Sequence, residues 1–424
     1  MENPKIRFKG FTKDWEQRKL GELVKEGILE APLDGNHGEK HPTSDEYVDS
    51  GIPFLMASDI HNGEVNIYSC KYITKERAER LDKGFARNGD VLLTHKATIG
   101  ETAILSNLMT EYAMLTPQVT YYRIKNEERL NREYLYSFFN SLDFQTELKT
   151  KAAQSTRPYI GITAQQNLKI ILPAEIDEQI RIGLYFRNLD HLITLHQRKC
   201  DQTKNLKKYM LQKMFPQNGA KVPEIRFDGY TYDWEQRRFG EITELKSASR
   251  VHKDEWTSNG VPFYRSSDVM TAINGTENEK AFISEELYEK LSKVSGKLEE
   301  GDILVTGGGS VGNPYIVPDN KPLYTKDADL LWIKNKGKFH PYFLYEFFFS
   351  PTFRNYLGSI SHVGTIAHYT ITQLSDTPIG LPIFEEQKEV GEYFQSLDRL
   401  ITLHQRKCDE LKKMKKYMLQ NMFI

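Results

Sequence analysis

The chain has 424 residues, with 57 basic and 58 acidic side chains and a formal net charge of -1. This length exceeds what one hydrophobic core usually organises, so we expect two domains with connecting elements. The near-neutral charge argues against a strongly basic nucleic-acid binder, and three scattered cysteines argue against a disulfide scaffold. Because we find neither a signal-peptide pattern at the start nor an apolar stretch of membrane-spanning length, we expect a cytoplasmic protein with no membrane partner.

The chain opens with a segment that returns in its second half. Residues 4–23 read PKIRFKGFTKDWEQRKLGEL, and residues 223–242 read PEIRFDGYTYDWEQRRFGEI. Weaker echoes follow in the same order: GIPFLMASD at residues 51–59 answers GVPFYRSSD at 260–268, and GDVLLT at 89–94 answers GDILVT at 301–306. The sequence is therefore an internal duplication whose interiors have diverged.

The interior of each half, from about residue 20 to 172 and from about 240 to 381, mixes short β-rich runs with helical stretches such as Arg132 to Leu148. This mixture predicts two small globular domains of the α/β (α+β) class with long loops. The clearest predicted strands are Val91 to Thr94, Gln118 to Ile124, Ile303 to Thr306 and Asp329 to Ile333.

Three stretches in each interior carry hydrogen-bonding side chains and have the composition of loops that read a ligand. Arg and Lys suit guanine edges, Asn and Gln suit adenine, and Ser and Thr suit bases or phosphates, so we take these residues as candidates for DNA binding. The simpler alternative for each one is an ordinary surface loop. The candidates are Ser58, Asn62, Thr94, His95, Lys96, Thr98, Gln154, Thr156, Arg157 and Tyr159 in the first half, and Tyr264, Arg265, Ser266, Ser267, Thr306, Ser310, His362, Thr365, His368 and Tyr369 in the second.

Each half closes with a long helical pattern. At an offset of 208, residues 190–216 and 398–424 are identical at 20 of 27 positions, and LITLHQRKCD occurs in both. Residues at heptad spacing predict one coiled-coil seam along each helix. The seam residues are Ile182, Phe186, Leu189, Ile193, His196 and Cys200 in the first helix, and Val390, Phe394, Leu397, Ile401, His404 and Cys408 in the second.

A helix of this length needs a partner, and the nearest candidate is its own repeat. We expect an antiparallel coiled coil with a pseudo-two-fold axis and one globular domain at either end. The expected boundaries are residues 1–174 and 217–382 for the domains, and 175–216 and 383–424 for the helices. The alternative is that each helix packs on its own domain or drives homodimerisation.

Two further features of the helices have simple explanations. The His and Cys of each seam, four residues apart, could in principle assemble a zinc site, but without a CxxC spacing we expect buried cysteines, hydrogen-bonded histidines and no metal. Basic residues gather toward both helix ends, which is typical of a solvated helix face; phosphate contact and docking to an acidic partner are the alternatives.

Catalytic motifs are missing from the chain. Gly307 to Gly312 matches GxGxxG, but its first-half counterpart, residues 95–100, keeps only the last glycine, and the βαβ context is unclear. The chain contains no GxxxxGK[ST] phosphate loop and no Pro-Pro-aromatic tetrapeptide of amino-methyltransferases. Pro318-Asp319 is not followed by the acid-x-Lys of a metal-dependent nuclease. We therefore expect no catalytic residues and no cofactor.

With duplicated DWEQR openings, divergent interiors and long helices ending in LITLHQRKCD, the whole chain resembles the specificity (S) subunit of a bacterial Type I restriction-modification enzyme. The resemblance implies that each interior is a target recognition domain reading one half of a bipartite, asymmetric site in double-stranded DNA. It also implies that the helices set the spacing and bind two modification subunits, which methylate adenine, while restriction subunits join the complex. A free-standing DNA methyltransferase and a coiled-coil scaffold without DNA binding remain the alternatives.

Overall fold

The computed structural model describes residues 4–153, 158–217, 219–326, 329–360 and 368–423. The chain forms two compact units: unit 1 consists of Met1–Gln197 and Gln405–Ile424, and unit 2 consists of Arg198–His404. Two helices of 38 residues, α6 (Ile176–Lys213) and α13 (Phe384–Asn421), are shared between the units. Each unit therefore contains the first part of one long helix and the last part of the other.

Unit 1 contains two four-stranded sheets, ordered β6-β3-β10-β7 and β2-β11-β8-β9, in which β3 and β10 run parallel and the other neighbours antiparallel. Its strands are β1 (Trp15–Lys19), β2 (Leu33–Asp34), β3 (Ile52–Leu55), β4 (Ile60–His61), β5 (Glu64–Val65), β6 (Lys71–Ile73), β7 (Phe85–Ala86), β8 (Val91–Lys96), β9 (Thr98–Ile104), β10 (Ala113–Leu115), β11 (Val119–Tyr122) and β12 (Lys169–Pro173). Its other helices are α1 (Leu20–Lys25), α2 (Lys75–Ala78), α3 (Arg132–Phe139), α4 (Leu142–Ala152) and α5 (Ile162–Gln166), with 3-10 turns at Gly38–Lys40, Ser44–Glu46 and Ala57–Asp59.

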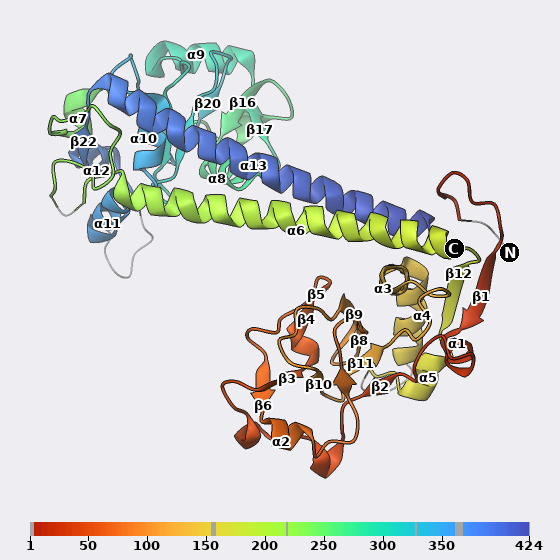
Figure 1. The fold of residues 1–424 in the computed structure, drawn as a ribbon. Helices are drawn as coiled ribbons and strands as arrows, with labels where there is room; N and C mark the ends of the chain where they lie inside the picture. Colours follow the sequence, from red (N-terminus) through yellow and green to blue (C-terminus); the bar gives the residue numbers. More distant parts are fainter. Residues whose placement is uncertain (1–3, 154–157, 218, 327–328, 361–367, 424) are drawn as a thin grey trace. The chain divides into compact units, whose positions relative to one another are not determined.

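Unit 2 repeats this plan with sheets ordered β14-β21-β18-β19 and β15-β17-β16-β20. Its strands are β13 (Glu235–Arg238), β14 (Leu245–Ser247), β15 (Trp256–Thr257), β16 (Val261–Tyr264), β17 (Ala281–Ile283), β18 (Ile303–Thr306), β19 (Pro314–Ile316), β20 (Tyr324–Thr325), β21 (Leu330–Ile333) and β22 (Pro378–Leu381). Its other helices are α7 (Phe239–Ile242), α8 (Ser266–Asn274), α9 (Glu285–Ser295), α10 (Pro341–Phe347), α11 (Pro351–Ile360) and α12 (Ile371–Asp376), with a 3-10 turn at Lys253–Glu255. The predicted mixed α+β class is confirmed (Figure 1).

The helical stretch predicted from Arg132 to Leu148 is helical in the structure and consists of two helices, α3 and α4. α3 ends at Phe139, and α4 begins after Ser141, whose hydroxyl accepts a hydrogen bond from the Phe144 amide at 3.3 Å. Asn140 contributes to the break because its side-chain amide donates back to the Tyr136 carbonyl at 2.8 Å. A serine that caps a new helix stops the previous one, although the apolar spacing continues through it.

The duplicated openings dock on the first turn of the long helix of their own half. In unit 1 the buried Glu178 carboxylate accepts hydrogen bonds from Arg7 Nε and Nη2 at 2.6 and 2.8 Å and from Trp15 Nε1 at 3.2 Å. In unit 2, Glu386 accepts two hydrogen bonds from Arg226 at 2.7 Å and one from Trp234 Nε1 at 3.2 Å. The repeated Arg, Trp and Glu therefore form the same buried clamp twice.

The antiparallel pairing predicted for the two long helices is confirmed within each unit (Figure 1). In unit 1, Lys415 Nζ lies 2.5 Å from the Asp190 carboxylate of α6. In unit 2, Lys207 Nζ lies 2.7 Å from the Asp398 carboxylate of α13. At the offset of 208 these two ion pairs are the same interaction, made once in each unit.

The seam side chains of both helices are buried or half-buried. Ile182, Phe186, Leu189 and Ile193 pack in the core of unit 1, and Val390, Phe394 and Leu397 pack in the core of unit 2. The Cys200 thiol lies 3.9 Å from the Ile401 carbonyl, and the Cys408 thiol lies 4.0 Å from the Ile193 carbonyl. His196 and His404 are half-buried. Among the residues that the structure describes, no group of three or more His, Cys, Asp or Glu is placed to hold a metal ion.

The far end of each long helix enters the aromatic core of the unit in which it ends. Phe423, just after α13, packs on Tyr134, Phe138 and Phe186 in unit 1, at ring separations of 5.7 to 5.8 Å. Phe215, just after α6, makes the equivalent contacts in unit 2. Its partners are Phe343, Phe347 and Phe394. The duplicated helix sequence thus anchors both ends of each helix.

Candidate nucleic-acid interface

In unit 1 the predicted reading loops are built around the β8–β9 hairpin. Ala97 forms its tip with a positive φ of 68°, and Lys96 pairs with Thr98 across the turn. Tyr159 lies beside the tip through a bridge with Lys96, and 38% of its surface is exposed. Lys96 and Thr98 are also exposed. The structure therefore brings these three candidates together on one exposed edge.

Two backbone hydrogen bonds and one hydrogen bond to a side chain join this hairpin to the other two predicted loops of unit 1. The His95 amide donates to the Gln118 carbonyl at 2.9 Å, and the His95 carbonyl accepts from the Ile160 amide at 3.2 Å. The Gln118 side chain accepts in turn from the Ala57 amide, next to Ser58, at 3.3 Å. We call the meeting point of these loops, at His95 and Gln118, the unit 1 junction.

Unit 2 contains an equivalent junction at Gly307 and Asp329. The Gly307 amide donates to the Asp329 carbonyl at 2.8 Å, and the Gly307 carbonyl accepts from the Tyr369 amide at 2.8 Å. The Ser266 hydroxyl also donates to the Asp329 carbonyl, at 2.9 Å. The two junctions thus share one backbone arrangement, whereas the loop that reaches the surface reads His-Lys-Ala-Thr in unit 1 and Gly-Gly-Gly-Ser in unit 2.

Four candidates are buried, so the prediction that they contact DNA directly was wrong for this structure. Thr94 and Thr306 are fully buried, and their hydroxyls accept the amides of Glu101 at 3.0 Å and Asn313 at 2.9 Å across their hairpins. His95 has no exposed surface, and Tyr369 is buried with its hydroxyl bonded to Thr377. These polar side chains satisfy buried backbone or side-chain groups, which would otherwise cost free energy.

The remaining candidates fall into three groups. Ser58, Asn62, Lys96, Thr98, Tyr159, Ser267, Ser310 and His368 are exposed. Tyr264, Arg265 and Ser266 are half-buried, and the Arg265 guanidinium is already paired with Asp268 at 2.8 Å. Gln154, Thr156, Arg157, His362 and Thr365 lie outside the described residues. The exposed group therefore supplies the candidates for direct contact, and that role stays a prediction.

A cluster of charged side chains around Asp34 lies next to His95 at the unit 1 junction. The buried Asp34 carboxylate is paired with Lys83 and with His37 Nε2, the latter at 2.9 Å. Burial raises the pKa of Asp34, but the hydrogen bonds from Lys83 and His37 outweigh it, so the pKa lies below its usual value. Burial lowers the pKa of His95 to about 4, so His95 is neutral near pH 7. The junction therefore rests on a compensated carboxylate and an uncharged imidazole.

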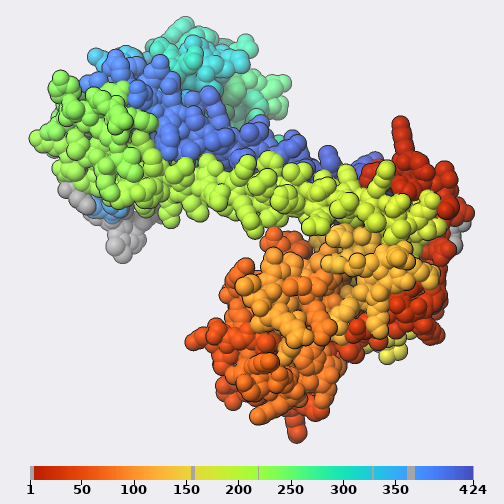
Figure 2. Space-filling view, viewed as in Figure 1, coloured from red at the N-terminus to blue at the C-terminus, as the bar shows by residue number. Residues whose placement is uncertain are grey.

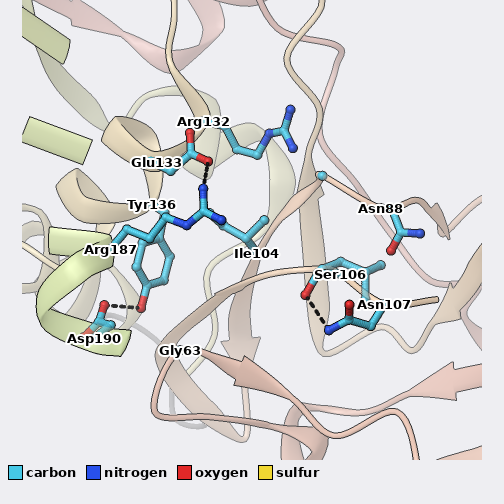
Figure 3. A pocket seen from close by; sticks show the side chains of 12 residues that line it. Gly63, Asn88, Ile104, Ser106, Asn107, Arg132, Glu133, Tyr136, Arg187 and Asp190 are labelled. Carbon is cyan, nitrogen blue, oxygen red and sulfur yellow. Dashed lines mark hydrogen bonds and ion pairs between the residues drawn. The ribbon is translucent and has the colours of Figure 1, made fainter. Parts of the chain in front are cut away.

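A pocket of about 460 Å³ in unit 1 is lined by residues of the β4–β5 turn, β9, α3 and α6 (Figure 3). Inside it, the Tyr136 hydroxyl donates to Asp190 at 3.2 Å, and Arg187 pairs with Glu133 at 3.3 Å. Gly63 sits so close to the Tyr136 hydroxyl that a Cβ atom there would lie 2.3 Å from it. The polar groups of the pocket thus hold α3 against α6.

The glycine run from Gly307 to Gly312 lacks the structure of a dinucleotide loop. It joins β18 to β19, two antiparallel strands paired from Ile303–Ile316 to Val305–Pro314. A phosphate-binding GxGxxG loop connects a strand to the N-terminus of a helix, which supplies the amides that hold the phosphates. The run is therefore a hairpin tip at the junction.

The residues missed from the sequence are those that organise the junctions. Gln118 and Asp329 accept the central backbone hydrogen bonds, and they occupy equivalent places in β-strand runs that the sequence did predict. An alignment of the two halves that matches GDVLLT with GDILVT, and then matches the predicted strands that begin at Gln118 and Asp329, could have shown that these two residues are equivalent. Because Gln118 and Asp329 have different side chains, residue type alone did not indicate that the two positions are equivalent.

Comparisons with known proteins agree with this duplicated plan. The family model for the Type I restriction modification DNA specificity domain matches residues 12–205 and again residues 232–413. The chain is 23% identical over 420 residues to the Type I restriction enzyme MjaVIII specificity subunit of Methanocaldococcus jannaschii, covering 95% of this chain and 90% of the relative. It is 26% identical over 170 residues to a putative Type I restriction enzyme specificity subunit of Haemophilus influenzae, S.HindORF215P, covering 38% of this chain and 40% of the relative.

A solved structure shares the fold. The crystal structure of the Type-I restriction-modification system S subunit from M. genitalium superposes with a TM-score of 0.63 at 14% sequence identity, covering 100% of this chain and 99% of that one. No helix among the described residues combines the length and apolar character that crossing a membrane requires. Since the family model covers both halves of the sequence, the chain belongs to the Type I restriction modification DNA specificity domain family.

Proposed function

We propose that this chain is the DNA-reading subunit of a Type I restriction-modification complex, and that each junction reads one half of a bipartite site. The observation that carries the proposal is the same pair of backbone hydrogen bonds, made at the centre of both junctions beneath different surface side chains. These side chains are Lys96, Thr98 and Tyr159 in unit 1, and Ser310 and His368 in unit 2. A fixed backbone with variable side chains is what direct readout of two different half-sites requires. The target is therefore asymmetric.

The helices serve as the spacer in this proposal. Because α6 begins in unit 1 and ends in unit 2, and α13 does the reverse, their length of 38 residues sets how far apart the two half-sites can be. The repeated clamps and the repeated ion pairs support a rigid connection at both ends of each helix. Two half-sites read from one face of the duplex are expected about one helical turn apart, roughly 34 Å.

The two long helices also offer two equivalent docking surfaces for the modification subunits. Each surface has four exposed apolar side chains that flank the seam on one side. In an antiparallel pair, equivalent positions of the two helices face the same side, so the four residues of a unit form one patch. The patches are Leu192, Leu195, Met414 and Tyr417 in unit 1, and Leu400, Leu403, Leu206 and Tyr209 in unit 2.

These patches support a stoichiometry of two modification subunits per chain. Figure 2 shows one face of α6 at the surface, and exposed Leu, Met and Tyr side chains in a cluster are typical of protein-binding surfaces. In the proposed complex the modification subunits carry the adenine methylation chemistry, and the restriction subunits join through the complex. This chain contributes no catalytic residue and no cofactor, and it acts on DNA in the bacterial cytoplasm.

The decisive experiment is methylome sequencing of cells that carry this chain with its modification subunit. We expect one bipartite motif with modified adenines, lost when this chain is deleted. Inserting one heptad into both α6 and α13 adds about 10.5 Å of helix and should lengthen the spacer by roughly three base pairs, at about 3.4 Å each, or abolish modification. It should leave each half-site unchanged. Altered half-sites would refute the spacer role. Methyl-donor binding by the purified chain alone would favour a free-standing methyltransferase, and complex assembly without any sequence preference would favour a scaffold.

A further inference from the structure

The two junctions differ most at one position. His95 in unit 1 corresponds to Gly307 in unit 2, and both residues use their backbone amide and carbonyl in the same two hydrogen bonds. Unit 2 therefore builds its junction with no side chain at this place. The imidazole of His95 must serve something that is particular to unit 1.

The contacts of the imidazole show what it holds. His95 Nδ1 lies 3.1 Å from the Ile160 carbonyl, and because a carbonyl only accepts, Nδ1 carries the proton and donates. The ring also packs against Tyr159, with 5.5 Å between ring centroids and 47° between ring planes. His95 thus binds the backbone and the side chain of the loop that carries Tyr159, while having no exposed surface of its own.

The other ring nitrogen, Nε2, is buried and has no hydrogen-bond partner among the residues that the structure describes. His95 Nε2 lies 3.9 Å from the Asp34 carboxylate, beyond hydrogen-bond distance, and that carboxylate is already paired with Lys83 and His37. The ring is therefore held through Nδ1 and through its contact with Tyr159, and it lies beside Asp34 without being charged itself. Tyr159 and Lys96, which lie on the solvent side of His95, are bridged to each other across the hairpin edge.

We propose that His95 is a positioning residue for DNA reading by unit 1. It holds the Tyr159 ring and, through the backbone bridge between Lys96 and Tyr159, the part of the hairpin that carries Lys96 at the DNA-facing edge. This inference rests on the proposed function. A lysine suits the acceptor atoms of guanine or a phosphate, and an exposed aromatic ring suits a thymine methyl or a sugar. At the corresponding place in unit 2, Gly307 has no side chain, and Tyr369 takes the place of Ile160. Only the first half-site therefore depends on support from an imidazole at this position.

The test uses the full chain in complex with its modification subunits, after the wild-type motif has been read from the methylome. Binding is measured to three duplexes: the intact site, a site with the first half scrambled and a site with the second half scrambled. We expect His95→Ala to lower the preference for an intact first half at least tenfold and to change the preference for the second half less than twofold. Tyr159→Ala should do the same, and the double variant should add less than threefold.

Matched variants separate positioning from stability. His95→Asn should rescue most of the preference, because its amide can donate the bond to the Ile160 carbonyl that Nδ1 makes. Leu93→Ala removes an equally buried side chain from the same strand; compared at equal folded fraction, it should leave both preferences within twofold of wild type. Tyr159 is partly exposed, so Tyr159→Ala keeps the test valid if His95→Ala fails to fold.

Three outcomes would overturn the inference. If His95→Ala and Tyr159→Ala act independently, so that their effects multiply, His95 does not work through Tyr159. If His95→Ala weakens the preference for both halves equally, its role is general folding. If the wild-type complex has no bipartite preference at all, the proposed function fails and this inference fails with it; an intact wild-type preference with multiplying variants overturns this inference alone.

Discussion

Removing Glu178 should destabilise unit 1 far more than removing an ordinary surface carboxylate. Its side chain has no exposed surface and accepts three hydrogen bonds, two from Arg7 and one from the buried indole of Trp15. Glu178→Ala leaves the Arg7 guanidinium, whose side chain is 13% exposed, without its buried counter-charge. Breaking a buried pair in this way costs about 3–5 kcal/mol, which lowers the unfolding temperature of a unit of this size by roughly 10 °C.

The matched control is Glu175→Ala. Glu175 pairs with Lys13 at 3.1 Å, but these side chains are 33% and 67% exposed, so its loss should cost less than about 1 kcal/mol. Hydrogen exchange measured by mass spectrometry shows which strands lose protection in each variant. Glu178→Ala should deprotect β1 and β12 and spare β13 and β22, whereas Glu386→Ala should show the reverse pattern because Glu386 makes the same clamp in unit 2.

Two results would refute this reasoning. If Glu178→Ala and Glu175→Ala destabilise the protein equally, the clamp contributes no more than a surface ion pair. If either clamp variant deprotects the strands of both units alike, the openings do not anchor their own halves separately.

Three further predictions concern single residues elsewhere in the two units. Gly183→Ala should cost about 1–3 kcal/mol, because its Cβ would lie 2.7 Å from the start of α3; Gly358→Ala, with nothing within 4 Å, should be neutral or stabilising by up to about 1 kcal/mol in thermal unfolding. Burial raises the pKa of Glu346 from 4.5 to about 8, so folded unit 2 retains a proton that the unfolded chain releases, and its stability should fall as the pH rises between these values. Glu346→Gln should flatten that slope in unfolding curves; an unchanged slope would show that another group is responsible. Leu192→Asp and Leu400→Asp should each remove one bound modification subunit in mass measurements of the complex, and loss of both subunits from either single variant would contradict two separate patches.

The parts of the fold that could be predicted from the sequence are those that the duplication repeats. The heptad spacing in two nearly identical segments predicts the helices, their seam and their antiparallel pairing, because a seam has to be buried against something. The clamp was also visible in principle: Arg7, Trp15 and Glu178 each have a counterpart in the second half, and a repeated buried acid beside a repeated Arg and Trp indicates a contact. The domain boundaries at residues 174, 216 and 382 stay predictions.

The residues proposed to contact DNA were harder to predict, because residue type alone does not show which side chains of these strands are buried and which are exposed. Five of the six residues of β8, including Thr94 and His95, are buried, so the strand lacks the alternation that marks an exposed face. A threonine that satisfies a hairpin amide and a threonine that faces DNA look alike in one sequence. Only the structure distinguishes Thr94, which is buried, from Thr98, which is exposed four residues later.

The junctions explain how a duplicated protein can diverge in its specificity without losing its fold. At His95 and at Gly307 the two central hydrogen bonds of the junction use the backbone amide and carbonyl, which every residue type except proline supplies together. Side chains at the surface end of each hairpin can therefore change while the loops keep their positions. The clamps and the helix pairs depend on particular side chains, Arg, Trp, Glu, Asp and Lys, and these are the residues that both halves retain. The repeated residues thus make the side-chain contacts of the clamps and the helix pairs, whereas the central contacts of the two divergent junctions are made by the backbone.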